Sequence, residues 1–225
     1  METDKKYKLT DECITIGDKK LYRIESLKDF AFIKKGDKGG FVESEENLSQ
    51  VGSCWIYNDT KVCGNAWVFG DAQVYGDAQV YDNAKVSGDA WVIGDAKVSG
   101  NAWVIGDAMV YGNAQVYGNA CVFGDAEIYD NVRVYGNAEV FGNVHIKGDA
   151  DISSISDYIF FKNWWSSGRC FTWTRSNNMW SVGCFYGTGE ELIAKAYKDS
   201  EISGREYKRV VKYVETTIIN DGKDQ

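Results

Sequence analysis

The sequence predicts an all-β solenoid, because a six-residue unit of the form Gly-(Asp/Asn)-Ala-x-Val-aromatic runs seventeen times without insertion or deletion over residues 52–153. The small and the branched residue of each unit are two positions apart, so both side chains point to the same side of an extended chain. A flat amphipathic sheet would need turn signals at hairpin spacing, whereas here a Gly-Asp or Gly-Asn pair recurs every six residues. The pattern therefore favours a solenoid over a flat sheet.

Residues eighteen positions apart sort by type, which indicates a coil with three sides. One corner column is Asn, the next is mainly Asp and the third is mixed, and a six-residue repeat alone would not separate them. With the degenerate unit 46–51, the eighteen units make about six coils over residues 46–153, the shaft. At roughly 4.8 Å per coil the shaft is about 29 Å long. The first column is Asn47, Asn65, Asn83, Asn101, Asn119 and Asn137, and the second is Ser53, Asp71, Asp89, Asp107, Asp125 and Asn143.

These tandem units resemble the hexapeptide repeat of left-handed β-helices, a superfamily that includes many trimeric acyltransferases. The resemblance implies left-handed coils, against the usual hand of parallel crossovers. Two further segments, GGFVESEENLSQVGSCWIY (39–57) and VGCFYGTGEEL (182–192), resemble segments of largely uncharacterised hexapeptide-repeat proteins of tailed phages, prophages and some bacteria. That group implies no activity for individual residues here.

The shaft is flanked by two smaller regions. Residues 1–45 predict an N-terminal β cap with strands in KYKL, CITI and KLYRI, the last two joined by a tight turn at Gly17-Asp18. Such a cap would cover the open first coil and block edge pairing.

Residues 154–225 predict a C-terminal α+β module with three strands, in DYIFFKNWW, RCFTWT and MWSVGCF, followed by two helices. The pairs Thr188/Glu191 and Ser203/Glu206 have capping-box spacing, and an apolar stripe on the second helix is expected to pack on the sheet. A hairpin centred on Asn177 would place Cys170 opposite Cys184, as a disulfide or as two thiols. The stripe is Tyr207, Val210, Val211 and Val214.

Charge and composition limit the possible partners and locations. The net charge is −8; the shaft holds 14 acidic and 5 basic residues and the flanks hold 19 and 20, so nonspecific nucleic-acid binding by the shaft is not expected. No apolar run is long enough to span a membrane, and METDKKYKLT lacks the apolar core of a signal peptide. The six cysteines show no C-x-x-C spacing. We therefore expect a cytoplasmic protein without a metal or cofactor, and the resemblance places it in an infected or lysogenic bacterial cell.

The slot before each Val points outward and carries tryptophans on two neighbouring faces of the shaft. We expect these side chains to form the seam of a homo-oligomer, a trimer by resemblance, with a dimer left open. A groove for another partner and scattered surface aromatics are the alternatives. The predicted interface residues are Trp55, Trp91 and Met109 in one column and Trp67 and Trp103 in the next.

The stacked aspartates of the second column repel one another. Two arrangements relieve this: each carboxylate accepts a backbone N–H within its own turn, or a cation binds between coils. We expect the first arrangement, and hence no metal site.

The C-terminal module interleaves aromatic and cationic residues, a combination that can stack a base and neutralise a phosphate. The alternative is that a small module uses its large side chains to build a core. The candidate binding residues are Lys162, Trp164, Trp165, Arg169, Trp173, Arg175 and Trp180.

Acyl transfer needs a general base, usually His, and a cleft for the acyl carrier. The sequence has one histidine, His145, in an outward slot of the shaft. We therefore expect a non-catalytic binding scaffold, an inhibitor of a bacterial defence system that binds a host protein or a small nucleotide. An acyltransferase and a virion or structural component are the alternatives.

Overall fold

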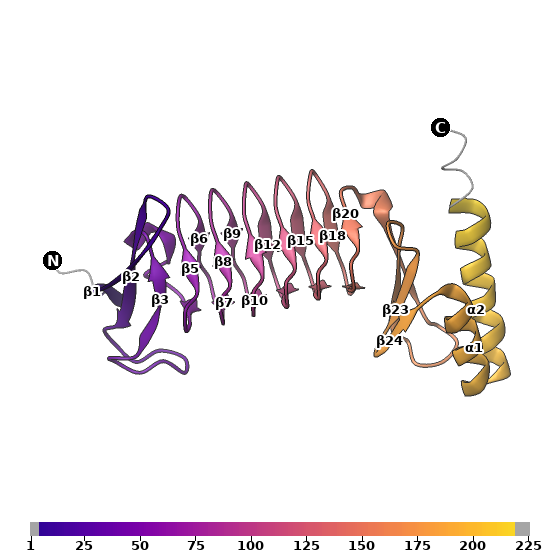
Figure 1. Cartoon of the computed structure of the whole chain (residues 1–225). Coiled ribbons are helices and arrows are strands. Elements are labelled where there is room, and N and C mark those ends of the chain that lie inside the picture. Colours follow the sequence, from indigo (N-terminus) through magenta and orange to yellow (C-terminus); the bar gives the residue numbers. More distant parts are fainter. Residues whose placement is uncertain (1–4, 219–225) are drawn as a thin grey trace.

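The computed structural model describes residues 5–218 and shows an elongated parallel β-solenoid with a β cap at one end and a strand-and-helix module at the other (Figure 1). The shaft makes about six turns, so the predicted solenoid is confirmed. Strands pair in parallel with an offset of eighteen residues, as Val98 does with Val80 and Val116. The three-sided coil inferred from the corner columns is therefore present.

Each side of the shaft is a ladder of very short strands. One side continues the cap sheet through β5 (Lys61–Val62), β8 (Gln79–Val80), β11 (Lys97–Val98), β14 (Gln115–Val116), β17 (Arg133–Val134) and β20 (Asp151–Ile152). The second side is β4 (Trp55–Ile56), β7 (Gln73–Val74), β10 (Trp91–Val92), β13 (Met109–Val110), β16 (Glu127–Ile128) and β19 (His145–Ile146). The third is β6 (Trp67–Val68), β9 (Lys85–Val86), β12 (Trp103–Ile105), β15 (Cys121–Phe123) and β18 (Glu139–Phe141).

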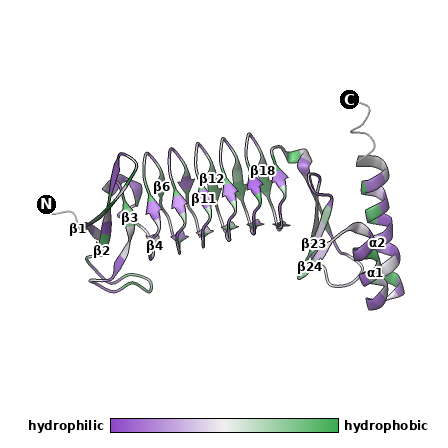
Figure 2. Ribbon diagram, viewed as in Figure 1, coloured by the Kyte–Doolittle hydropathy of each residue, from purple (hydrophilic) through white to green (hydrophobic). Residues whose placement is uncertain are grey.

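The interior of the shaft is built from the repeated Ala and Val positions, which are fully buried from Ala72 to Ile152. Figure 2 shows the resulting alternation of apolar and polar residues along the coils. The corners require positive φ: Gly88 has φ 71°, and a Cβ there would lie 2.8 Å from the backbone nitrogen of Gly106. Glycine is favoured at these corners because it adopts positive φ without a side-chain clash.

The Asn column forms a hydrogen-bonded ladder along one corner. The amide of Asn65 donates to Asn83 at 2.9 Å, and Asn83 donates in turn to Asn101 at 3.2 Å. Asn101 donates to Asn119 at 2.9 Å, and Asn119 to Asn137 at 3.0 Å. An amide can donate and accept at once, whereas a carboxylate can only accept. This difference explains why asparagine is sorted into its own column.

Asp71 of the second column differs from the expectation of a hydrogen bond within its own turn. Asp71 accepts the backbone N–H and the hydroxyl of Ser53, one coil away. At the two other corners, Asp82 and Asp130 accept the N–H groups of Gly100 and Gly148, respectively, from the following coil. The hydrogen bonds seen for these aspartates therefore tie coils together rather than closing single turns.

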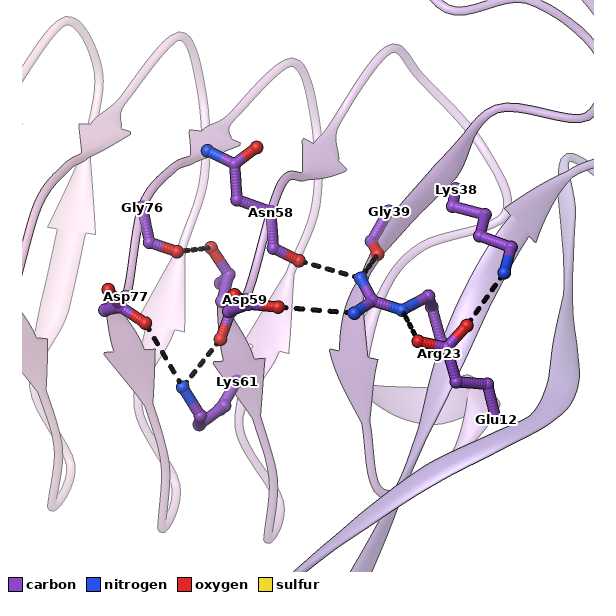
Figure 3. A network of polar contacts seen from close by, with 10 residues as sticks. Glu12, Arg23, Lys38, Gly39, Asn58, Asp59, Lys61, Gly76 and Asp77 are labelled. Atoms are coloured by element: carbon purple, nitrogen blue, oxygen red, sulfur yellow. Dashed lines mark hydrogen bonds and ion pairs between the residues drawn. The ribbon is translucent and has the colours of Figure 1, made fainter.

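The cap sheet consists of β1 (Tyr7–Ile16), β2 (Lys19–Ser26) and β3 (Lys38–Val42), and β3 joins the shaft through β5. The predicted turn at Gly17 is present, but KYKL and CITI form one strand with an irregularity between Leu9 and Cys13. Figure 3 shows how Arg23 fastens the cap: its guanidinium lies 2.6 Å from Glu12 and 3.2 Å from Asp59 of the first coils.

The C-terminal module begins after a 3-10 turn (Ile155–Asp157), the counterpart of the one at Glu45–Asn47 where the shaft begins. Its antiparallel sheet consists of β21 (Tyr158–Lys162), β22 (Cys170–Thr174), β23 (Met179–Val182) and β24 (Phe185–Gly187). Two helices, α1 (Gly189–Asp199) and α2 (Glu201–Tyr213), follow, with a π-helical turn at Val214–Ile218. β22 and β23 contact β19, so the sheet lies between the last coil and the helices.

Three details of this module correct the sequence predictions. The third predicted strand is two strands, with a turn between Val182 and Phe185. Trp173 pairs with Trp180, so the hairpin is centred between Ser176 and Asn177 and not on Asn177. Cys170 and Cys184 are therefore not opposite each other, and all six cysteines are free.

The second helix starts earlier than predicted, because Ser200 rather than Ser203 caps it by accepting the Ser203 N–H at 3.0 Å. The Thr188/Glu191 box is present. The apolar stripe packs as expected, with Tyr207, Val211 and Val214 buried in the module core.

Candidate functional site

The tryptophans of the shaft do not share one environment. Trp55 is 1% exposed because the cap covers it, with Tyr7 and Phe30 packed edge-on against its ring. Its predicted place on an outward interface is therefore wrong. Trp67, Trp91 and Trp103 are 40%, 42% and 41% exposed, and Met109 is half-buried.

The candidate binding residues of the C-terminal module also differ in how far they are buried. Trp173 and Trp180 are buried in the core between the sheet and the helices, so the expectation that they form a binding surface is wrong. Trp165 packs half-buried against Tyr207, with ring centroids 5.1 Å apart, while Trp164 is 78% exposed.

The three predicted cations do not converge. Lys162 is exposed and, by the alternation of β21, shares the sheet face of Tyr158, which packs into the shaft core. Arg169 precedes β22 and Arg175 follows it, so the two arginines lie at opposite ends of this strand. Arg175 faces the shaft junction, where its Nε donates to the Ser156 carbonyl at 3.2 Å. Of these cations, only Arg169 lines the cavity described next.

A half-open cavity of about 400 Å³ lies in the module between the loop that follows β21, the β23–β24 turn and the two helices; we call it the module cavity. The single residue Ser200 links α1 to α2, and α2 begins beside the cavity. Its polar lining is Asn163, Ser166, Ser167, Arg169, Lys195, Asp199, Ser200, Ser203 and Tyr207, and its apolar lining is Val182, Phe185, Leu192 and Ala196.

Asn163 organises the cavity lining. Its side chain is buried, and its carbonyl oxygen accepts the backbone N–H groups of Trp165 and Ser166 at 3.2 and 3.0 Å. Its amide donates to the Ser166 hydroxyl at 2.8 Å and to the Tyr207 hydroxyl at 3.2 Å. Because both hydroxyls are acceptors in these bonds, their own protons remain available to a ligand.

Several donors of the lining have no partner. Within residues 5–218, no hydrogen bond or ion pair is formed by the guanidinium of Arg169 or the ammonium of Lys195. Ser203 is 6% exposed, and its hydroxyl likewise has no partner within this range. Arg169 and Lys195 are exposed and Ser203 is nearly buried, and all three line the cavity, so their donors can reach a ligand that enters it.

The electrostatics of the lining keep its donors protonated. Burial raises the pKa of the Tyr207 phenol and the nearby Asp199 carboxylate adds to this, while the Asn163 hydrogen bond and Arg169 act in the opposite direction. Tyr207 is therefore an O–H donor at neutral pH. The lining combines many donors with one carboxylate, which suits reversible binding of an acceptor-rich ligand.

The sequence predicts Arg169 as a binding residue but does not indicate that Asn163, Lys195, Ser203 and Tyr207 share its site. The ring of Tyr207 packs in the predicted apolar stripe, while its hydroxyl reaches Asn163. The Asn-x-x-Ser spacing of 163–166 was the available signal, since an Asn that accepts two following N–H groups forms a local turn.

The lone histidine lies in a hydrogen-bonded row on the shaft. Nδ1 of His145 is 3.0 Å from Glu127, and the same carboxylate oxygen accepts the Tyr111 hydroxyl at 3.3 Å. The backbone N–H of His145 donates to the Thr172 hydroxyl at 3.4 Å, which places this histidine at the junction with the C-terminal sheet.

In the part of the chain that the structure describes, no three His, Cys, Asp or Glu side chains gather as a metal site would require. None of the described helices is long and apolar enough to cross a membrane.

Comparison with known proteins supports the repeat architecture. Residues 78–94 and 114–127, both within the shaft, match the family model described as YdcK Beta solenoid repeat. No curated protein matches the chain. The matched segments belong to the repeat alone, so this similarity concerns the shaft.

Proposed function

We propose that this β-solenoid protein is a non-catalytic binding scaffold whose C-terminal module recognises the partner. The observation that carries the proposal is the module cavity, where Arg169, Lys195 and Ser203 present donors without partners in the described chain. The shaft repeats nearly the same surface in each coil, whereas the cavity combines unlike groups in a single place. A unique surface can be selective, and a rigid shaft can set the spacing of several such surfaces.

The partner class follows from the resemblance to phage and prophage proteins. We propose an inhibitor of a bacterial defence system that acts in the cytoplasm of an infected or lysogenic cell by binding a host protein or a small nucleotide. The acidic shaft disfavours nonspecific binding of nucleic acid.

The test is capture from a bacterial lysate with the purified full chain, followed by mass spectrometry of the protein and small-molecule fractions. We expect a partner that is retained by the parent and by Arg175→Ala but lost with Arg169→Ala, because of these two arginines only Arg169 lines the cavity. A partner retained equally by all three proteins would move recognition to the shaft and contradict the proposal.

We also propose that the chain forms a trimer through the faces that bear Trp67, Trp91 and Trp103, which would raise the effective concentration of three modules on an oligomeric target. Light scattering should give three times the 25.2 kDa chain mass. Trp103→Lys should lower that mass, whereas Gln115→Lys on β14, on the side of the shaft without these tryptophans, should not. A parent protein that stays at 25.2 kDa at micromolar concentration would refute the trimer.

Acyl transfer is the second candidate, and one observation favours it: Glu127 holds Nδ1 of His145 at 3.0 Å, as a carboxylate does when it orients a general base. His145→Ala separates the two candidates, because it removes the base that acyl transfer would need.

A further inference from the structure

We propose that the module cavity binds a small organic phosphate, a monoester with a hydroxyl-bearing or apolar remainder. This inference rests on the proposed function of the C-terminal module and names the chemistry of its ligand.

The first step is the excess of donors. Arg169 and Lys195 are cationic, and Ser203, Ser166 and Tyr207 each offer a hydroxyl proton that no described residue accepts. A phosphate has several strong acceptor oxygens and a charge of about −1.5 to −2 near neutral pH, so it satisfies more of these donors than a neutral ligand would.

The second step is the position of α2. Ser200 caps this 13-residue helix and Ser203 lies in its first turn, so the helix begins at the cavity lining. The N-terminal end of a helix carries a partial positive charge and favours an anion. The C-terminal end of α1, at Asp199, lies beside the same cavity and its partial negative charge opposes this field, so the positive charge of the cavity comes mainly from Arg169 and Lys195.

The third step limits the ligand to one with an organic part. Val182, Phe185, Leu192 and Ala196 form an apolar wall, which inorganic phosphate would leave unfilled. The Asp199 carboxylate repels a ligand that is anionic over its whole surface but can accept a hydroxyl of an ester. A volume of about 400 Å³ lies within the range of small-molecule sites.

Isothermal titration of the full chain tests the inference with three probes: phenyl phosphate, inorganic phosphate and phenol. We expect phenyl phosphate to bind with one site per chain, at least about tenfold more tightly than either other probe, because only phenyl phosphate fills both the cationic and the apolar part. Arg169→Gln and Lys195→Gln should each weaken its binding about tenfold, as expected for loss of one charge-assisted bond.

Arg175→Gln and Lys198→Gln are matched controls, since each removes one charge of the module outside the cavity lining. Both should bind within twofold of the parent, and thermal melting should show that all four variants fold. Absence of phenyl phosphate binding, or weakening by the controls as large as by Arg169→Gln, overturns the inference.

The capture experiment separates this inference from the proposed function. If a protein partner is lost with Arg169→Ala while phenyl phosphate does not bind, the module recognises its partner but the phosphate inference is wrong. If phenyl phosphate binds through Arg169 and Lys195 while capture is unaffected by Arg169→Ala, the cavity is a phosphate site, but the proposal that the module recognises the partner is wrong.

Discussion

The hydroxyl of Tyr186 occupies the space into which a Cβ of residue 148 would project, so the C-terminal module fits closely onto the shaft at Gly148. Gly148 has φ 76°, and Tyr186 comes from β24 of the module sheet. The contact joins the last coil to a residue 38 positions further along the chain.

Gly148→Ala should therefore loosen the module from the shaft. We expect a loss of unfolding free energy clearly larger than the ~1 kcal/mol typical of alanine at positive φ, because the methyl group must also displace Tyr186. Gly142→Ala is the matched control, with φ 80° and a nearest neighbouring atom 3.5 Å away, on Phe160. Urea denaturation of both variants measures the difference, and equal losses would show that the Tyr186 contact contributes nothing.

The repeat made the shaft predictable, because one local rule is applied in every coil. Ala and Val recur where they must point inward, and the separation of Asn from Asp by column anticipated a ladder such as Asn83 to Asn101. The same rule failed at Trp55, whose slot is outward in the repeat but lies under the cap in the fold. Its burial depends on contacts with residues about 25 and 48 positions earlier, which no repeat encodes.

The candidate site was less predictable because it is assembled from distant segments. Arg169 precedes β22 while Lys195 and Ser203 belong to two helices, and only packing brings them to one cavity. The hairpin register shows the same limit, since a one-residue shift changes which residues face each other. Sequence pattern located the strand, but pairing of Trp173 with Trp180 decided that Cys184 lies outside the paired segment.

Asn101→Asp should interrupt the amide ladder. The variant loses the donor to Asn119, and its carboxylate then faces the Asn119 carbonyl oxygen, so we expect a loss of about 1 kcal/mol of unfolding free energy at pH 7. Asp107→Asn in the neighbouring column removes a stacked negative charge and should leave stability equal or higher. If urea denaturation ranks the two variants in the reverse order, the ladder does not stabilise the shaft.

Stability should fall as the pH rises above 10, because buried phenols resist ionisation in the folded state. Burial raises the pKa of Tyr129 to about 12 and also raises the pKa values of Tyr57 and Tyr111 from a usual value near 10. Because the pKa of each tyrosine is higher in the folded state, its contribution to the unfolding free energy is fully present below pH 10 and is lost as the pH rises through the folded pKa. Burial lowers the pKa of Lys6, so the contribution of this lysine to the unfolding free energy grows as the pH rises toward 10.5. This single lysine opposes three tyrosines, so the net unfolding free energy should still fall.

Urea denaturation at pH 8, 9.5, 10.5 and 11.5 measures this decline. Tyr57→Phe should flatten it, because one phenol that ionises in the unfolded chain is removed. An unfolding free energy that is constant to pH 11.5 would contradict the prediction.

His145→Ala should leave partner capture and oligomer mass unchanged, because we assign recognition to the module cavity and no catalytic role to the shaft. The variant removes the bond to Glu127 but keeps the backbone N–H that donates to Thr172, so the junction should remain intact. We expect a change in unfolding free energy within about 1 kcal/mol, as is usual for a partly exposed hydrogen bond. Release of free thiol from acetyl-coenzyme A in the presence of a bacterial small-molecule extract tests acyl transfer directly, and we expect none. Thiol release by the parent that is abolished in His145→Ala, with melting and oligomer mass unchanged, would establish the acyltransferase instead.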